Sequence, residues 1–180
     1  GYLNEVGETE VFVTNLSTSL ALDKLAESKG SSVVRSAVGE INVVNKMNEL
    51  GSKLGGEGNG GVILREAHLG RDSLVAATMV LNRMSQSSEP LSEIHLSLPQ
   101  FEIVKDKVNL EGIDPDELIK KACTLFYDAE KNTLDGIKFT WTDRWVHLRK
   151  SNTEPIMRIY AEGPYREDAQ KLIEKVESCI

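Results

Sequence analysis

Two short stretches of the chain carry side chains that could recognise hydroxyls and anions. The first, residues 55–61, contains five glycines, and Glu57 and Asn59 supply its only side chains. A carboxylate accepts hydrogen bonds from hydroxyls, and an amide both donates and accepts. This pairing suits the neighbouring hydroxyls of a sugar, while the glycines, Gly60 among them, would let the ring approach the backbone. The alternative is a flexible turn that binds nothing, and the residues alone favour neither.

The second stretch is rich in groups that bind phosphate. Its residues are Arg149, Lys150, Ser151, Asn152, Thr153, Glu154 and Pro155, and Arg158 follows shortly afterwards. Arginine can bind a phosphate through two parallel hydrogen bonds, and successive N–H groups in a turn form a concave anion site. A plain hairpin would favour Asn-Gly or Gly-Asn at its tip, which this stretch lacks. The predicted phosphate ligands are Arg149, Ser151, Asn152, Thr153 and Arg158.

Other reactive side chains have ordinary structural explanations. His68 could shuttle a proton, but a single histidine beside a helix start is more often structural, and Asp72 suits either the first turn or the cap of that helix. No cluster of His, Cys, Asp or Glu has metal-site spacing, so we expect neither a metal ligand nor a catalytic residue in this chain. Cys123 and Cys179 form no C-x-x-C pair, and a reduced, cytoplasmic location is expected.

Composition narrows the classes of partner. The 180 residues are 40% hydrophobic and 27% charged, as in ordinary globular proteins. The formal net charge of −7 argues against binding nucleic acid through bulk charge. The longest near-apolar run, residues 74–81, is too short to cross a bilayer. We therefore expect neither a nucleic acid nor a membrane as partner.

The first half alternates strands with helices. Strands are predicted at residues 11–13, 32–34 and 62–64. Helical spacing of apolar residues appears after Ser17, which is the expected cap, and again before Gly51 and over 74–84. This order predicts an α/β layered domain with a mostly parallel or mixed sheet over residues 1–99.

The second half has a different order. Strands are predicted at 101–110, 136–141, 145–149 and 156–161. A helix begins at Asp114 and Pro115, and another ends the chain. Residues 100–180 are therefore expected to form a small α+β domain with an antiparallel sheet of about four strands and two helices.

Together the two polar stretches resemble loops of the α-D-phosphohexomutases, which include phosphoglucosamine mutase, phosphomannomutase and phosphoglucomutase. That family has four domains. Its third carries a sugar-binding loop, Gly-Glu-x-Ser-Gly-His, and its fourth a phosphate-binding loop, Arg-x-Ser-Asn/Gly-Thr-Glu-Pro. Residues 56–61 are similar to the first loop, and residues 149–155 match the second without a gap. Residues 36–40 also look like the family segment that leads into a helix of the third domain.

Three positions depart from the family pattern. Asn59 replaces the usual serine, Gly61 replaces the usual histidine, and Ala37 stands near a position that is often basic. The pattern looks closer to a phosphoglucosamine mutase-like or archaeal-type phosphomannomutase branch. The resemblance implies that Glu57, Asn59 and Gly60 contact the sugar of a hexose phosphate.

The family's remaining chemistry lies outside this sequence. Its phosphoserine loop, Thr-x-Ser-His-Asn-Pro, and its magnesium loop, Asp-Gly-Asp-Gly-Asp-Arg, are both absent. Because the chain starts with Gly1, we expect it to be domains three and four of a longer enzyme, inactive without domain one and the Mg²⁺ of domain two. That enzyme would interconvert hexose 6-phosphate and hexose 1-phosphate through a bisphosphorylated intermediate. The alternatives are a stand-alone sugar-phosphate binding module and a structural pair of domains that binds nothing.

Overall fold

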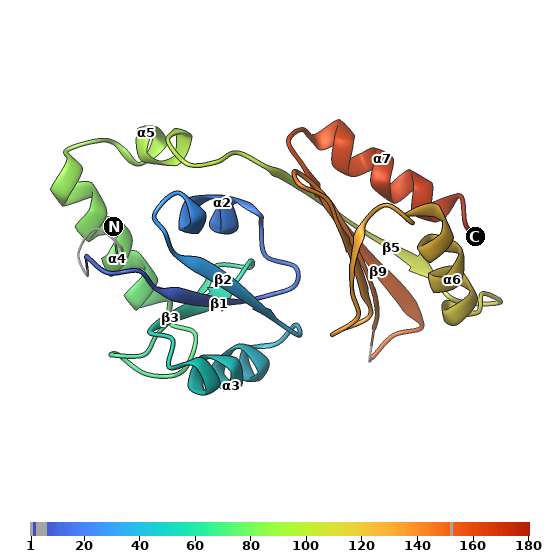
Figure 1. Cartoon of the computed structure of the whole chain (residues 1–180), viewed down its shortest axis with the longest axis horizontal. Helices are drawn as coiled ribbons and strands as arrows, with labels where there is room; N and C mark the ends of the chain where they lie inside the picture. The colour runs from blue at the N-terminus through green and yellow to red at the C-terminus, as the bar shows by residue number, and fades with distance from the viewer. Residues whose placement is uncertain (1, 3–6, 152) are drawn as a thin grey trace. The chain divides into compact units, whose positions relative to one another are not determined.

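The computed structural model describes Tyr2 and residues 7–151 and 153–180. The chain divides into two compact units, Gly1–Gln100 and Phe101–Ile180 (Figure 1). No helix in the described part of the chain combines the length and apolar character needed to span a membrane.

A four-stranded mixed sheet forms the centre of the first unit. Its strands are β1 (Val11–Asn15), β2 (Ser32–Ser36), β3 (Leu54–Glu57) and β4 (Gly61–Leu64), in the order β2-β1-β3-β4. β1 runs parallel to β2 and β3, whereas β4 is antiparallel to β3. Helices α2 (Ala21–Glu27) and α3 (Glu40–Leu50) lie on opposite faces of the sheet (Figure 1). The predicted α/β fold with a mixed sheet is confirmed.

The glycine-rich stretch is largely a strand rather than a flexible turn. Residues 54–57 form β3, which the sequence analysis did not predict. A Cβ on Gly55 would lie 2.5 Å from the Met47 sulfur, and one on Gly56 would lie 2.4 Å from the Gly61 carbonyl oxygen. These glycines are required because α3 and β4 approach β3 too closely for a side chain.

Two helix ends in this unit follow their sequence signals, and one does not. Gly51 ends α3 in the left-handed conformation, with φ of 67°. Asp72 caps α4 (Ser73–Ser87), where its carboxylate accepts from two N–H groups, and α5 (Leu91–Leu96) follows. The prediction that Ser17 caps the next helix is wrong. α2 starts at Ala21, and the Ser19 hydroxyl accepts from its N–H at 3.0 Å.

The second unit contains an antiparallel sheet with five strands, one more than predicted. The strands are β5 (Glu102–Asn109), β6 (Glu130–Asn132), β7 (Ile137–Thr140), β8 (Trp145–Lys150) and β9 (Ile156–Gly163), in the order β5-β9-β8-β7-β6. The additional strand is β6. Its sequence, Glu-Lys-Asn, is short and polar, and it forms because it pairs with β7.

Two helices, α6 (Pro115–Leu125) and α7 (Arg166–Glu177), pack on one face of this sheet. Asp114 caps α6, and Pro115 occupies its first turn, as predicted. The core combines residues of β8 and β9 with residues of the two helices: Val146, Leu148, Met157, Ile159, Leu118, Ala122, Ala169 and Ile173. Because side chains alternate along a strand, Arg149 and Arg158 lie on the sheet face opposite these helices.

Candidate substrate-binding loops

The predicted sugar-binding residues lie at the tip of the β3–β4 hairpin. Glu57 ends β3, and Asn59 and Gly60 form the exposed turn before β4. The Gly60 N–H donates to the Glu57 carbonyl at 3.1 Å, and the Asn59 side-chain oxygen accepts from the Gly61 N–H at 3.2 Å. Gly60 has φ of 92°, which favours glycine. The structure therefore brings these three residues together, with Asn59 shaping the turn.

Glu57 is held by donors from three other segments. Its Oε1 accepts from the Asn15 amide nitrogen at 2.9 Å and from the Gly39 N–H at 3.1 Å. Its Oε2 lies 3.2 Å from Nη1 of Arg71, and the side chain is only 5% exposed. A carboxylate offers about four lone-pair positions. These contacts fix its orientation and leave acceptor capacity on Oε2.

Arg71 connects Glu57 with the start of α3. Its Nε donates to Glu40 at 2.8 Å, and its backbone N–H donates to the other oxygen of Glu40 at 3.1 Å. The hydrogen bond from the Arg71 side chain is the main reason that the pKa of Glu40 lies below its usual value. In turn, the bond to Glu40 and the charge of Glu57 raise the pKa of Arg71. Both carboxylates therefore share one cation.

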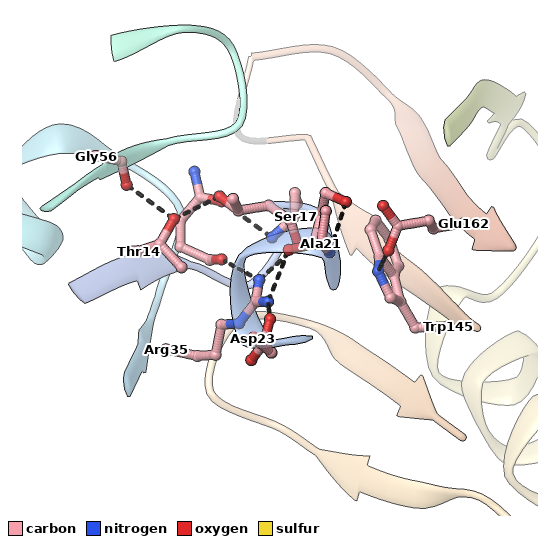
Figure 2. A network of polar contacts seen from close by, with 11 residues as sticks. Thr14, Ser17, Ala21, Asp23, Arg35, Gly56, Trp145 and Glu162 are labelled. Carbon is pink, nitrogen blue, oxygen red and sulfur yellow. Dashed lines mark hydrogen bonds and ion pairs between the residues drawn. The ribbon is translucent and has the colours of Figure 1, made fainter. Parts of the chain in front are cut away.

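The loop after β1 forms a neighbouring wall of the hairpin. The Thr14 hydroxyl donates to the Gly56 carbonyl at 2.9 Å, as Figure 2 shows. A Cβ on Gly58 would lie 3.0 Å from Cα of Thr18, so this loop and the hairpin turn are in close contact. The Arg35 guanidinium holds the loop from below by binding its carbonyls and the Asp23 carboxylate (Figure 2). The hydrogen bond and the close contact thus hold the loop after β1 against the β3–β4 hairpin.

The predicted phosphate ligands lie around the β8–β9 hairpin of the second unit. Arg149 of β8 is directly opposite Arg158 of β9 in the strand register. Opposed residues of an antiparallel pair point from the same face and have Cβ atoms roughly 5 Å apart. Two guanidinium groups therefore project from one face at the base of residues 151–155.

Some of the predicted phosphate-binding groups make hydrogen bonds within the hairpin itself. The Ser151 N–H donates to the Ile156 carbonyl at 2.9 Å, which closes the hairpin. The hydroxyl oxygens of Ser151 and Thr153 are 3.4 Å apart, and the Thr153 N–H points at the Ser151 hydroxyl. Asn152, the fifth predicted ligand, lies outside the described residues. The arginines and the two hydroxyls are the groups that the structure brings together.

Each arginine also has a carboxylate neighbour. Asp135 binds Nε of Arg149 at 2.8 Å, and Glu154 lies 3.6 Å from Nη2 of Arg158. The sequence analysis did not single out Asp135. The sequence shows it only as one acidic residue before Gly136, in the turn between β6 and β7. This carboxylate holds the Arg149 side chain from the β7 side of β8.

His147 lies in the same strand, two residues before Arg149. It is 2% exposed, and its Nε2 is 2.6 Å from the Asp135 carbonyl oxygen. Because a carbonyl only accepts, Nε2 carries the proton. Burial lowers the pKa of His147, so the ring is neutral at neutral pH. His147 therefore supports the segment that carries Asp135 without adding positive charge.

Two other residues of the first site were also missed by sequence reasoning. Asn15 and Arg71 contact Glu57 from the ends of other segments. Asn15 carries a usable signal, since it is a polar residue at the end of the strand that begins with the apolar run Val11-Phe12-Val13. Asp72, which follows Arg71, is the cap of α4, one of its two predicted roles. Nδ1 of His68 lies 3.8 Å from its carboxylate. Hydrogen bonds from two backbone N–H groups lower the pKa of Asp72.

No group of three His, Cys, Asp or Glu side chains in the described residues could hold a metal ion. The magnesium loop that the resemblance implies belongs to the family's second domain, and its Asp-Gly-Asp-Gly-Asp-Arg string is absent from this sequence.

Comparison with known proteins identifies the family. Residues 2–101 match the description Phosphoglucomutase/phosphomannomutase, alpha/beta/alpha domain III, and residues 104–178 match the Phosphoglucomutase/phosphomannomutase C-terminal domain. The chain belongs to this family and comprises these two domains. The resemblance to the α-D-phosphohexomutases is thereby confirmed.

Relatives extend well beyond the part that this chain matches. A phosphoglucomutase/phosphomannomutase of Thermococcus kodakarensis is 36% identical over 91% of this chain and 36% of its own length. A phosphoglucosamine mutase of Methanococcus maripaludis is 28% identical over 99% of this chain and 41% of its own length. The crystal structure of a Burkholderia thailandensis family protein has a TM-score of 0.81 at 21% identity, over 99% of this chain and 38% of that protein. The chain thus spans about two fifths of such relatives.

Proposed function

We propose that this chain supplies the sugar-binding and phosphate-binding loops of a phosphohexomutase. The enzyme interconverts hexose 6-phosphate and hexose 1-phosphate through a bisphosphorylated intermediate. The observation that carries the proposal is that Arg149 and Arg158 are directly opposed on the two strands of the hairpin that also carries the Ser151 and Thr153 hydroxyls. Family membership supports it.

In this proposal each loop holds one end of the substrate. Arg149, Arg158, Ser151, Thr153 and Asn152 bind the phosphate that is not reacting. Glu57 accepts a hydrogen bond from a ring hydroxyl, and Asn59 and Gly60 line the ring. Binding energy from this distant phosphate would position the reacting oxygen for transfer. One phosphate site would serve both half-reactions, because the intermediate carries two phosphates.

We assign the chemical step to the first and second domains, which other family members carry in addition to the two domains present here. The phosphoserine and magnesium loops of the family are absent from this sequence. The proposed partners are therefore a hexose phosphate and the first two domains, with Mg²⁺ bound in the second of those. The chain alone is expected to bind without turnover. A cytoplasmic location is part of the proposal and agrees with two free cysteines.

The sugar is proposed to be glucosamine, with mannose and glucose as the alternatives. The names of the relatives include both phosphoglucosamine mutase and phosphoglucomutase/phosphomannomutase. Calorimetric titration of the chain with the three hexose 6-phosphates and with inorganic phosphate tests the proposal. We expect all three sugars to bind, glucosamine 6-phosphate most tightly, and Arg149→Ala to weaken all of them. A chain that binds none of these ligands would contradict the proposed function.

A further inference from the structure

The Asn15 side chain links Glu57 to the loop that follows β1. Its amide nitrogen donates to Oε1 of Glu57 at 2.9 Å. Its amide oxygen accepts from the Ser17 N–H at 3.0 Å and lies 3.0 Å from the Thr18 hydroxyl. Since both neighbours of the oxygen can donate, the amide has one favourable orientation. The nitrogen must face the carboxylate.

This link is buried and joins two adjacent parallel strands. Asn15 is 5% exposed, as is the Glu57 side chain. Asn15 ends β1, Glu57 ends β3, and the two strands pair in register through Thr14 and Gly56. The carboxyl ends of neighbouring parallel strands are where α/β proteins bind ligands. Asn15 therefore fixes Glu57 at the edge of the sheet where a sugar would bind.

We propose that Asn15 is a positioning residue that holds the Glu57 carboxylate in the orientation needed to accept from a substrate hydroxyl. This inference rests on the proposed role of Glu57. Asn15 and the Gly39 N–H occupy Oε1, so that Oε2, beside Arg71, is the oxygen presented to substrate. Asn15 acts through Glu57 and through the loop at Ser17.

An aspartate at position 15 would have nearly the same size as asparagine, but it would repel the Glu57 carboxylate instead of donating a hydrogen bond to it. It would keep the acceptor for Ser17 and Thr18, but it would replace the donor to Glu57 with a second carboxylate. Two carboxylates in contact cannot both ionise freely, and the pair shares a proton. The charged groups around the pair are Arg71 and Glu40 on the hairpin side and Arg35 and Asp23 beneath the loop. Arg71 is already shared between two carboxylates, so it cannot fully neutralise a third.

The test combines a titration with a binding measurement on Asn15→Asp. Carbon-13 NMR of the Glu57 side-chain carboxyl follows its protonation in the 180-residue chain. We expect a two-step titration in Asn15→Asp, with the upper step above the range of wild type. Relative to wild type at the same pH, affinity for glucose 6-phosphate should fall about tenfold or more at pH 8 and recover largely below the upper step of the NMR titration, where the pair holds its proton. Affinity for inorganic phosphate should be unchanged.

A matched control separates this effect from added charge. Asn45→Asp makes the same substitution at an exposed position of α3 and should match wild type in both measurements. If Asn15→Asp titrates at Glu57 like wild type, or loses sugar affinity equally at every pH, the proposal is overturned. If Asn15→Asp does not fold, Asn15→Ala removes the donor without adding charge. An unchanged Glu57 titration in Asn15→Ala would also overturn it.

The two proposals fail in different ways. A wild-type chain that binds no hexose phosphate contradicts the proposed function. The NMR titration still decides whether Asn15 controls the Glu57 carboxylate, because it needs no ligand.

Discussion

Arg149 and Arg158 face each other across the β8–β9 hairpin at directly opposed positions. Like charges placed directly opposite on adjacent strands destabilise a sheet. Here each guanidinium has its own carboxylate, Asp135 for Arg149 and Glu154 for Arg158. The arrangement leaves a pair of cations beside a turn that carries two hydroxyls. A phosphate dianion would reduce the repulsion that remains, and this gives the hairpin a physical reason to bind one.

Removing the first of these cations should weaken phosphate binding. We expect Arg149→Ala to reduce the affinity for a hexose 6-phosphate by about 1.5–3 kcal/mol, the range for a hydrogen bond to a charged group. Calorimetry measures the change directly. Lys150→Ala is the matched control, because Lys150 is opposite Met157 and so projects from the other face of the sheet. Equal losses in the two variants would mean that general charge, rather than this site, binds the ligand.

Neutralising Glu57 should affect the sugar and not the phosphate. In Glu57→Gln an amide group must face either the Asn15 and Gly39 donors or Arg71, so one good acceptor becomes a donor. We expect affinity for a hexose 6-phosphate to fall by about 1–3 kcal/mol, with inorganic phosphate affinity unchanged. Glu49→Gln, on the exposed side of α3, is the control. Loss of affinity for both ligands would indicate a folding role for Glu57.

A side chain at Gly136 should destabilise the second unit far more than one at Gly112. Both glycines have positive φ, 70° and 75°. A Cβ at Gly136 would lie 2.2 Å from the Leu148 carbonyl oxygen and 3.0 Å from Cα of Arg149, whereas nothing lies within 4 Å of one at Gly112. We expect Gly112→Ala to cost about 1 kcal/mol and Gly136→Ala about 3 kcal/mol or more.

Urea unfolding followed by tryptophan fluorescence measures both changes, because both tryptophans lie in this unit. Similar costs for the two variants would show that backbone strain alone requires glycine at position 136. In that case β8 would have room to shift away from the new methyl group.

Burial of His147 predicts a loss of stability at acidic pH. Burial lowers the pKa of this ring in the folded state below the value of about 6.5 in the unfolded state. Below pH 6.5 the unfolded chain therefore binds a proton that the folded chain binds only at lower pH. The free energy of unfolding should fall by up to about 1.4 kcal/mol per pH unit from this group, with no contribution above pH 6.5.

The substitution His147→Gln should remove this part of the pH dependence. Urea unfolding of both proteins at pH 7.5 and 5.5 measures it as the difference between the two slopes. The exposed His95, in the first unit, provides the control substitution His95→Gln. Identical pH dependence in wild type and His147→Gln would mean that the ring takes up its proton over the same pH range in the folded and unfolded states.

The sequence predicted correctly those elements whose start or end is specified by residues within or next to the element. Asp114 and Pro115 specify the start of α6 through a cap and a fixed φ, and the strands predicted on either side of residues 150–155 form the β8–β9 pair. β3 was missed because Gly55 and Gly56 have low strand propensity. They are in a strand because Met47 and Gly61 pack against them, and that contact depends on tertiary structure.

The geometry of the proposed sugar site could be predicted only in part for the same reason. Glu57 and Asn59 were visible because glycines isolate them in the sequence. The partners of Glu57, which are Asn15, Gly39 and Arg71, come from three segments that meet only once the strand order is set. No local pattern encodes that order. A polar residue at the end of an apolar strand, as at Asn15, is the one hint that the sequence contains.

The pairing of β5 with β9 has a consequence for how the second unit forms during synthesis. β5 is the first strand of this sheet to be made, yet its neighbour β9 is the last. At ribosomal rates β5 must wait roughly 3–10 s, while roughly 50 further residues are added, before it can pair. Such distant pairing also slows folding once the chain is complete. Lys105, Asp106 and Lys107 are exposed on this strand, and charged side chains of this kind discourage pairing with other chains during the delay.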